Sequence, residues 1–334
     1  MADQSFLALV ARKDADGTCT RAIEERQVED LPAGAVLVRV LYSSLNYKDA
    51  LSGSGNTGVS KHYPHTPGID ATGVVVYSSD PAFEEGDEVL CTGYDLGMNT
   101  SGGLGQFIRV PAEWLVRKPK TLTFLESMQL GTAGYTAALS VLTLQDNGVM
   151  PVKGEILVSG ATGGVGSIAT HLLSQLGYRV VALTSKDDAA DYLRNLGAAG
   201  IESPQHFLAN KDRLLLSARW AGVVDTVGGD ILATAVKSTC FDGVVAICGN
   251  AASHEIPLNV YPFILRGVHL IGIYSADTPM DKRLRVWEKL AGEWKLPKMA
   301  QLSRIIPLGQ VPAEMDAMLA GKGKGRVVVD VQEV

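Results

Sequence analysis

The sequence predicts an α/β protein with a β-rich domain and a second domain built on a doubly wound parallel sheet. Short apolar runs separated by turn signals fill the first third of the chain. After residue 125, short apolar runs alternate with helical patterns, which is typical of a parallel sheet with helices on both faces. A last apolar run at 325–331 follows that region and can return to the first domain.

Three strands are expected in the β-rich part, at residues 37–42, 73–77 and 87–91. Turn-rich stretches such as 53–58 lie between them. Short strands with frequent turns indicate a sandwich or a barrel.

The second part is expected to alternate strand and helix. The expected strands are 155–159, 178–184, 223–225, 244–247 and 269–273. The expected helices are 126–144, the stretch from the glycines to Leu176, 187–196 and 281–294. Gly177 and Gly197 follow two of these helices, as C-terminal caps do.

Composition and charge exclude several classes of protein. The chain has 334 residues and a net charge of −6, so we expect about two domains and no general nucleic-acid binder. No apolar run approaches the roughly 18 residues of a membrane span. The start, Met1-Ala2-Asp3-Gln4-Ser5, lacks the basic and apolar regions of a signal peptide. Four widely spaced cysteines fit a reducing compartment, so a cytoplasmic protein is expected.

The sharpest motif is the glycine-rich run after the strand 155–159. Gly160, Gly163 and Gly166 follow that strand directly and open the next helix. A pyrophosphate binds well at such a place, because small residues let it approach backbone N–H groups and the helix dipole favours an anion. The strand-loop-helix context therefore predicts a dinucleotide site rather than a merely flexible turn.

The end of the following strand predicts which dinucleotide binds. Enzymes that use NAD carry an acidic residue about 20 positions after the glycines, where it binds the ribose 2′-hydroxyl. This strand ends in Thr184-Ser185-Lys186, and Ser185 and Lys186 can hold a 2′-phosphate that a carboxylate would repel. Asp187 and Asp188 follow, and Asp188 fits a Ser-x-x-Asp helix cap. We therefore expect NADPH rather than NADH.

Several strings resemble the medium-chain dehydrogenase/reductase superfamily, and the resemblance covers essentially the whole chain. They are residues 67–73, 131–137, 159–166 and 224–228. Two longer strings, 43–51 and 262–268, resemble its acryloyl-CoA reductase branch, one of the zinc-free, quinone-oxidoreductase-like groups.

The resemblance implies a fold and a domain division. It implies a GroES-like, partly open β-barrel catalytic domain at 1–126 and 276–334, and an inserted Rossmann NADP-binding domain at 127–275. The active site would lie in the cleft between the domains, where ligands commonly bind. A homodimer is implied as well, joined edge to edge around residues 260–275.

The zinc pattern of the superfamily is missing. Ile69 stands where zinc-dependent members have a histidine ligand, and Asn46 stands about where they have a cysteine. Residues 94–103 match a lobe that carries four cysteines in alcohol dehydrogenases, and they contain none. Isoleucine has no donor atom, so a metal-free protein is expected. Reduction of an activated C=C bond or a quinone then fits better than alcohol dehydrogenation, which loses its Lewis acid.

By resemblance, the expected reaction is the NADPH-dependent reduction of acryloyl-CoA to propionyl-CoA, with hydride transferred to the β-carbon. A quinone or enone oxidoreductase on the same scaffold is the alternative, and a non-catalytic NADPH-binding sensor is a lesser one. The fold alone does not decide between them. The expected partners are a small-molecule substrate, enoyl-CoA or quinone, and a second copy of the chain, but neither nucleic acid nor membrane.

Two residues match catalytic positions of the family. Tyr47 would donate a hydrogen bond or a proton near the nicotinamide, where a developing enolate gains from such a donor, or it would only pack on the cofactor ring. Asn46 would be a polar donor in the cleft, or a loop amide that satisfies nearby backbone. Asp70 replaces the glutamate of the superfamily and is expected to bind local backbone or a cation.

Further residues match cofactor contacts of the family. The pyrophosphate would face Thr162, Gly163, Gly164 and Val165, and the 2′-phosphate would face Thr184, Ser185 and Lys186. The other matched positions along the cofactor are Tyr47, Asn250, Ser275 and Arg326. For Arg326 the alternative is a surface charge beside Lys322 and Lys324.

Overall fold

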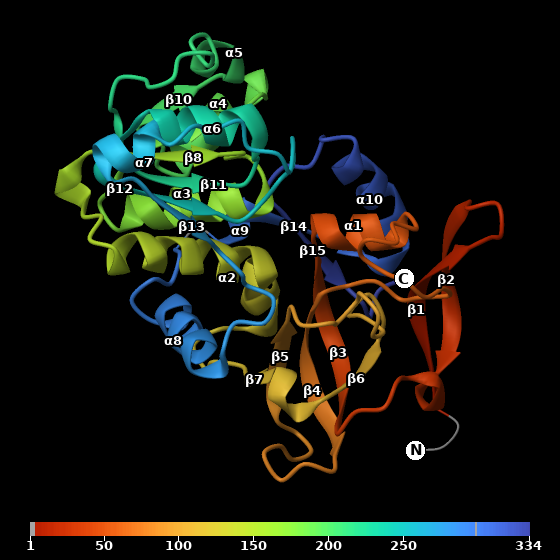
Figure 1. Ribbon diagram of the computed structural model, residues 1–334. Coiled ribbons are helices and arrows are strands. Elements are labelled where there is room, and N and C mark those ends of the chain that lie inside the picture. Colours follow the sequence, from red (N-terminus) through yellow and green to blue (C-terminus); the bar gives the residue numbers. More distant parts are fainter. Residues whose placement is uncertain (1–3, 298) are drawn as a thin grey trace. The chain divides into compact units, whose positions relative to one another are not determined.

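The computed structural model describes residues 4–297 and 299–334 and divides into two compact units (Figure 1). Unit 1 takes residues from 1–132, 276–291 and 298–334, and unit 2 takes 133–275 and 292–297. The predicted division had its first boundary at 126/127 and left 292–297 in the first domain, whereas the boundary at 275/276 coincides. Residues 1–3, on which the expectation about a signal peptide rests, lie outside the described residues.

Unit 1 is built on a seven-stranded sheet with two open edges. Its main path runs β14-β15-β3-β4-β5-β7, and β6 pairs with β3 beside that path. The strands are β3 Val36–Leu45, β4 Asp70–Ser78, β5 Glu88–Thr92, β6 Phe107–Val110, β7 Leu115–Arg117, β14 Ser303–Pro307 and β15 Arg326–Asp330. A separate antiparallel hairpin joins β1 Ser5–Lys13 and β2 Cys19–Gln27. This sheet is the partly open barrel that the resemblance implies.

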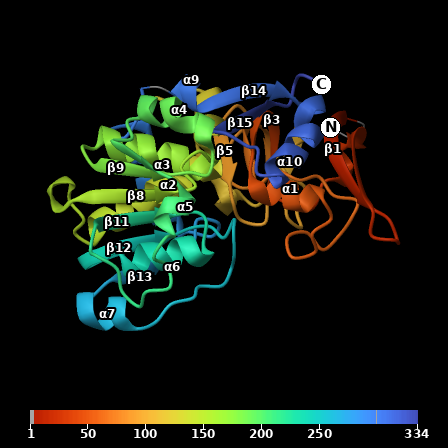
Figure 2. The same cartoon turned by 90° about the horizontal axis from the view of Figure 1, so that it is seen from above.

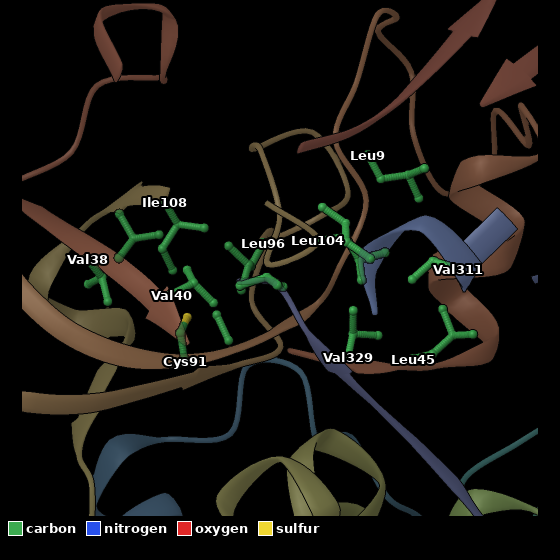
Figure 3. Packing of buried hydrophobic residues seen from close by; sticks show 14 of the residues in the cluster. Leu9, Val38, Val40, Leu45, Cys91, Leu96, Leu104, Ile108, Val311 and Val329 are labelled. Carbon is green, nitrogen blue, oxygen red and sulfur yellow. The ribbon is translucent and has the colours of Figure 1, made fainter. Parts of the chain in front are cut away.

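The core of unit 1 collects apolar side chains that alternate along its strands. Val38 and Val40 of β3 point to the same side, two residues apart, and Val329 of β15 joins them. Figure 3 shows Leu9 of β1 and Val311 of the helix α10 (Val311–Leu319) in the same cluster. Because strands from both ends of the chain share this core, the C-terminal segment belongs to unit 1.

The last strand joins the sheet of unit 1, as the sequence predicts. β15 pairs antiparallel with β3, placing Val327 opposite Leu45 and Val329 opposite Ser43. The parallel strand β14 covers the other edge of β15. This pairing brings Arg326 beside Asn46, although 280 positions separate them in the chain.

Short helices flank these strands. They are α1 Tyr47–Gly53, α8 Met280–Ala291, α9 Met299–Leu302, α10, and the 3-10 helices η1 Val28–Asp30, η2 Ala112–Trp114 and η5 Leu308–Gln310. The long helix α2, Phe124–Asp146, breaks at Gly131, where φ is 52° and ψ is −154°. The division between the units falls just after this break, at Thr132, rather than at the start of the helix.

Unit 2 is a six-stranded parallel sheet. Its order is β10-β9-β8-β11-β12-β13, and Figure 2 shows β9, β8, β11, β12 and β13 following one another in this order. Numbered along the chain, the order reads 3-2-1-4-5-6, which is the doubly wound order of dinucleotide-binding sheets. The strands are β8 Glu155–Ser159, β9 Arg179–Leu183, β10 Gly200–Glu202, β11 Trp220–Asp225, β12 Thr239–Ile247 and β13 His269–Gly272. The predicted Rossmann topology is confirmed.

Helices cover both faces of this sheet (Figure 1). On one face Ile231 of α6 packs with Leu157 of β8. On the other face a Cβ at Gly222 would meet Ile156 of β8 and Leu144 of α2. Leu157 and Ile156 are successive residues and so point to opposite faces. The helices of unit 2 besides the second part of α2 are α3 Gly164–Gln175, α4 Ala190–Asn195, α5 Pro204–Phe207, α6 Gly229–Lys237, α7 Tyr261–Arg266, η3 Pro151–Lys153 and η4 Asp187–Ala189.

The structure adds strands that the sequence pattern did not predict, namely β1, β2, β6, β7, β10 and β14. In β2 four of nine residues are charged and none is fully buried, so no apolar run marks it. The expected helix 187–196 is also two shorter pieces, η4 and α4. In the part of the chain that the structure describes, no helix has the length and apolar character to cross a membrane.

Candidate functional site

The glycine-rich loop of unit 2 connects β8 to α3. β8 ends at Ser159, Gly163 precedes the helix, and α3 starts at Gly164. The N–H of Gly163 donates to the Gly160 carbonyl and the N–H of Ser167 donates to the Gly163 carbonyl, each at 2.9 Å. The N–H groups between them, those of Gly164, Val165 and Gly166, form the first turn of α3, where backbone donors precede the helical ladder. An anion at this end of α3 would meet these N–H groups and the positive end of the helix dipole.

Two glycines of the loop are needed for different reasons. Gly160 has φ of 58°, and a Cβ on it would lie 2.2 Å from Thr226 Oγ1, so the packing of unit 2 itself requires glycine. Gly163 has an ordinary φ of −76°, and a Cβ there would meet only the Gly160 carbonyl oxygen, at 3.3 Å. Glycine at 163 therefore chiefly keeps the space in front of α3 open, which fits a pyrophosphate.

Asp225, at the end of β11, accepts hydrogen bonds that connect the start of the glycine-rich loop to the turn after β11. Ser159 Oγ donates to Asp225 Oδ1 at 2.7 Å, and the N–H of Gly228 donates to Oδ2 at 2.8 Å. Burial raises the pKa of Asp225, and these hydrogen bonds oppose the rise. Sequence reasoning matched the string 224–228 to the family but assigned Asp225 no role in the site.

The end of β9 opens on a hollow of about 370 Å³. The lining residues are Thr184, Lys186, Asp187, Ala190, Ile201, Glu202, Ser203 and His206. Of the three residues predicted to surround a 2′-phosphate, Thr184 and Lys186 thus lie together, whereas Ser185 is exposed beside them. The cap expected from Asp188 is absent, because η4 starts at Asp187 without a side-chain cap.

Asn250 and Ser275 follow β12 and β13. Asn250 Cα lies 3.3 Å from the position of a Cβ on Gly228, next to the Asp225 turn. Thr136 Oγ1 of α2 donates to Ser275 Oγ at 2.8 Å. Because all six strands are parallel, the residues that follow them lie at the carboxyl ends of the strands, where doubly wound sheets bind ligands. The structure therefore brings the unit 2 residues of the predicted cofactor site to the same end of the sheet.

Unit 1 holds a polar cluster around the fully buried Asp70, the first residue of β4. Ser44 Oγ and Asn46 Nδ2 donate to Asp70 Oδ2 at 2.6 and 2.7 Å. Thr132 donates to the same carboxylate through its backbone N–H and through Oγ1. Of the two expected partners of Asp70, local backbone or a cation, the cation is confirmed, because Arg326 is its ion-pair partner. The backbone group that it binds belongs to Thr132, 62 positions away.

Arg326 lies inside this cluster with 2% of its surface exposed. Its Nη2 is 3.6 Å from Asp70 Oδ2 and donates to Ser44 Oγ at 2.6 Å, and Nη1 donates to Asn46 Oδ1 at 3.1 Å. Burial lowers the pKa of Arg326, and two neighbouring carboxyl groups oppose that shift. The alternative that Arg326 is a surface charge is wrong. A contact with a cofactor stays a prediction, since all its described partners belong to unit 1.

Gly131 lets the broken helix α2 approach the cluster. A Cβ at Gly131 would lie 2.5 Å from Ser44 Oγ and 2.6 Å from Asp70 Oδ2. The break also presents the N–H of Thr132 to Asp70 at 2.9 Å, where a continuous helix would use it in the backbone ladder. The helix kink and the buried cluster therefore depend on the same glycine.

Asp49, in the first turn of α1, is a second buried carboxyl group beside the cluster. The N–H of Asn46 donates to its Oδ2 at 2.7 Å, and the N–H of Ile69 donates to its Oδ1 at 2.8 Å. Burial raises the pKa of Asp49 to about 7, although both hydrogen bonds oppose the rise. Sequence reasoning assigned Asp49 no role, and the structure shows it joining the start of α1 to the residue before β4.

Asn46 links the cluster to Tyr47, the first residue of α1. Asn46 Nδ2 donates to the Ser44 carbonyl at 3.1 Å as well as to Asp70, which uses both N–H bonds of the amide. The predicted role of Asn46 as a donor to a substrate therefore does not fit, because no N–H of its side chain is left. Its arrangement matches the alternative, an amide that holds nearby groups in place.

Tyr47 has a different environment. Its side chain is 46% exposed, and within the described ranges no residue forms a hydrogen bond with its hydroxyl. Tyr47 follows an anchored residue and begins a short helix. The hydroxyl of Tyr47 can therefore donate a hydrogen bond to a ligand, and the backbone that carries it is anchored by the hydrogen bonds of Asn46.

Two family models match the chain. A model described as an alcohol dehydrogenase GroES-like domain matches residues 32–120, and one described as zinc-binding dehydrogenase matches residues 164–291. YhfP of Bacillus subtilis, named a putative quinone oxidoreductase, is 44% identical over 97% of this chain and 98% of its own. AcuI of Ruegeria pomeroyi, named an acrylyl-CoA reductase, is 43% identical over 98% of this chain and 99% of its own. This chain belongs to the medium-chain dehydrogenase/reductase superfamily. The superfamily membership predicted from the sequence is confirmed.

This medium-chain dehydrogenase/reductase also resembles solved structures of its relatives. The yhdH oxidoreductase from Salmonella enterica in complex with NADP aligns with a TM-score of 0.94 and 41% identity, covering 97% of this chain and 99% of that one. The Bacillus subtilis yhfP structure with NAD bound aligns with a TM-score of 0.95 and 44% identity, covering 98% and 100%. The fold class is therefore confirmed across nearly the whole chain.

The residues of this medium-chain dehydrogenase/reductase do not fit the zinc that one family description names. Ile69, at the position matched with a histidine ligand, is 4% exposed and has no donor atom. Asn46 and Asp70 are both engaged in the polar cluster. Across residues 4–297 and 299–334, no group of three or more His, Cys, Asp or Glu side chains could hold a metal ion.

Proposed function

We propose that this chain uses NADPH to reduce the activated C=C bond of an enoyl thioester, converting acryloyl-CoA to propionyl-CoA. The observation that carries the proposal is the 43% identity, over 98% of the chain, to a relative named acrylyl-CoA reductase. A second relative, named a probable acrylyl-CoA reductase and from Escherichia coli, is 41% identical over 95% of the chain.

The residues of unit 2 support NADPH as the cofactor. NADPH would supply the hydride when bound, and the chain would hold and orient it. The N-terminus of α3, with Gly164 and Val165, would receive the pyrophosphate, and Thr184 and Lys186 would receive the 2′-phosphate. One solved relative carries NADP and another carries NAD, so the residues at the end of β9 are what favours NADPH.

Tyr47 is the proposed donor to the reacting thioester. Addition of hydride at the β-carbon moves an electron pair towards the thioester oxygen, and the α-carbon then takes up a proton. A positioned hydrogen-bond donor stabilises that charge. Tyr47 is half-exposed and has free donor capacity, whereas Asn46 and Arg326 act as positioning residues that hold the β3–α1 junction.

The experiment follows NADPH oxidation at 340 nm with acryloyl-CoA, with a simple quinone in parallel and with NADH as the cofactor control. Turnover of acryloyl-CoA well above that of the quinone would support the proposal. Tyr47→Phe is expected to lower kcat about 100-fold. Tyr77→Phe is the matched control, because Tyr77 is 49% exposed on the same unit. An unchanged kcat in Tyr47→Phe would mean that Tyr47 only packs on the cofactor.

Reduction of a quinone or an enone is the second candidate. It is favoured by the 44% identity to YhfP, which is named a putative quinone oxidoreductase. Turnover of the quinone alone would select this candidate. Binding of NADPH without turnover of any acceptor would select the sensor instead.

We also propose that the chain forms a homodimer through the edge of unit 2. β13 ends the sheet, and unpaired sheet edges need cover. Val260, Ile264 and Leu265 beside it are 61%, 68% and 57% exposed. Light scattering after size exclusion is expected to give twice the chain mass, and Ile264→Glu is expected to give the monomer.

A further inference from the structure

The buried carboxylate of Asp225 lies at the end of β11, between two of the loops that follow the strands of unit 2. Its Oδ1 accepts from Ser159 Oγ at 2.7 Å, and Ser159 is the residue before the glycine-rich loop. Its Oδ2 accepts from the N–H groups of Val227 and Gly228 at 3.3 and 2.8 Å, in the turn that leads to α6. The two oxygens therefore hold two different loops together.

A third loop, after β12, is attached to the same turn through backbone groups. The Asp225 carbonyl accepts from the N–H of Cys248 at 2.9 Å, and the Val227 carbonyl accepts from the N–H of Ala252 at 2.8 Å. This loop carries Asn250, one of the predicted cofactor residues. The segment around Asp225 therefore joins three loops that lie at the carboxyl ends of β8, β11 and β12.

Among the residues that the structure describes, the groups that donate to the Asp225 carboxylate are neutral, namely one hydroxyl and two backbone N–H groups. Burying a carboxylate without a cation costs free energy that an asparagine of nearly the same shape would not incur. An asparagine, however, has one acceptor oxygen and one NH₂ group, so it cannot accept both from Ser159 and from the turn. The contact on two sides therefore explains why a carboxylate stands at this position.

The place of the glycine-rich loop decides where its N–H groups can meet a pyrophosphate, because hydrogen bonds weaken when the donor and acceptor lie more than about 3.2 Å apart. On the β9 side the loop is fixed by a backbone hydrogen bond, from the N–H of Ala161 to the Leu183 carbonyl at 3.1 Å. On the β11 side it is fixed by the side chains of Asp225 and Thr226, whose Oγ1 donates to the Ser159 carbonyl at 3.0 Å. A substitution on the β11 side therefore moves the pyrophosphate donors and leaves the hollow at the end of β9 intact.

We infer that Asp225 is a positioning residue for the dinucleotide, which acts through Ser159 to hold the glycine-rich loop where its N–H groups meet the pyrophosphate. This inference rests on the proposed use of a nicotinamide dinucleotide. The pyrophosphate is common to NADPH and NADH, so Asp225 sets the affinity for both. The choice between them is left to the residues at the end of β9.

Calorimetric titration of the full chain with NADP⁺ and with NAD⁺ tests the inference. Ser159→Ala removes the hydroxyl that Asp225 binds, so both dissociation constants should rise about tenfold while their ratio stays the same. Asp225→Asn removes one of the two acceptor atoms and should weaken both dinucleotides likewise. The double variant should bind about as well as the weaker single variant, because both substitutions break the same contact. The value of kcat at saturating NADPH should not change.

Ser238→Ala is the matched control. Ser238 Oγ is buried, donates to the Thr234 carbonyl at 2.7 Å and accepts from Trp220 Nε1 at 3.0 Å. Ser159 Oγ likewise donates once and accepts once, but Ser238 precedes β12, at the amino ends of the strands. Both serine variants should lower the melting temperature by similar amounts, and Ser238→Ala should leave both dissociation constants unchanged.

Unchanged dissociation constants in Ser159→Ala, or equal weakening in Ser238→Ala, would overturn the inference and leave the NADPH proposal intact. Weakening of NADP⁺ alone would also overturn it, because the effect would then lie at the 2′-phosphate. Equal affinities of the unaltered chain for the two dinucleotides, both weakened in Ser159→Ala, would support the inference and refute the choice of NADPH. An unaltered chain that bound neither dinucleotide would overturn both.

Discussion

The two candidate regions of this protein use different chemical groups: the loop of unit 2 uses backbone groups, and the cluster of unit 1 uses side chains. The loop of unit 2 offers backbone N–H groups at the start of α3, and glycines keep side chains away from them. The cluster of unit 1 is made of side chains, and Asp70, Asn46 and Arg326 are each hydrogen-bonded to other members. An added methyl group should therefore damage the first region, and a deleted side chain should damage the second.

The largest expected effect is in unit 1. Asp70→Ala leaves the buried charge of Arg326 without its partner, so we expect a loss of about 3–5 kcal/mol in the free energy of unfolding. Urea denaturation measures it. Ser44→Ala removes one hydrogen-bonding hydroxyl from the same cluster and should cost only about 1–2 kcal/mol. Equal losses in the two variants would show that the charge pair is not what the cluster depends on.

The second-largest expected effect is a dependence of the stability on pH, which comes from Asp49 of unit 1. The folded state raises the pKa of Asp49 to about 7 from 3.8, so the folded chain holds a proton that the unfolded chain has released between these values. The contribution of Asp49 to the free energy of unfolding is therefore present at low pH and is lost as the pH rises towards 7. The free energy of unfolding should fall by about 2–3 kcal/mol between pH 5 and pH 8 for this reason. Denaturation of the wild type and of Asp49→Asn across this range measures the difference in slope. Parallel curves would contradict the assignment to Asp49.

In unit 2 the damaging change is an added methyl group. Gly160→Ala and Gly177→Ala both place alanine at positive φ, which costs about 1–2 kcal/mol each. Only Gly160→Ala also brings a Cβ to 2.2 Å from Thr226 Oγ1, whereas Gly177 has nothing within 4 Å. We expect an extra loss of about 2 kcal/mol for Gly160→Ala in thermal denaturation. Adding Thr226→Ala should recover part of the extra loss, and an equal cost at both glycines would argue against the clash.

The smallest expected effect concerns cofactor choice rather than folding. Lys186→Gln should lower the ratio of kcat/KM for NADPH to that for NADH about tenfold, because one charge-assisted contact is lost. Stability should hardly change, which a melting curve checks. Lys153→Gln is the control, since Lys153 is exposed just before β8, at the amino ends of the strands and away from the hollow. If both substitutions changed the ratio alike, general charge rather than the hollow would set the preference.

The sequence by itself determined those features whose parts lie in one stretch of chain. The predicted strand 155–159 is β8, and the strand, glycine loop and helix follow in order. The sequence analysis also allowed the last strand to return to the first domain, and β15 pairs with β3 there. Contacts of these residues with a cofactor stay predictions.

Only the tertiary structure decided what the side chains of unit 1 do. Arg326 was matched with a cofactor contact or a surface charge, and it is a buried ion-pair partner of Asp70. Asn46 was expected to face a substrate, and its amide is used within the cluster. Gly131 marks a break inside a pattern that reads as one helix.

The two regions differ in how far apart in the sequence their residues lie, and this explains why only one of them could be predicted. A backbone site needs small residues at fixed local spacing, so the pattern of glycines reveals it. A buried side-chain cluster needs partners and the exclusion of water, and both arise only when β15 pairs with β3, across 280 positions of chain. Burial and partners, rather than residue type, therefore decided the roles of Asp49, Asp70 and Arg326.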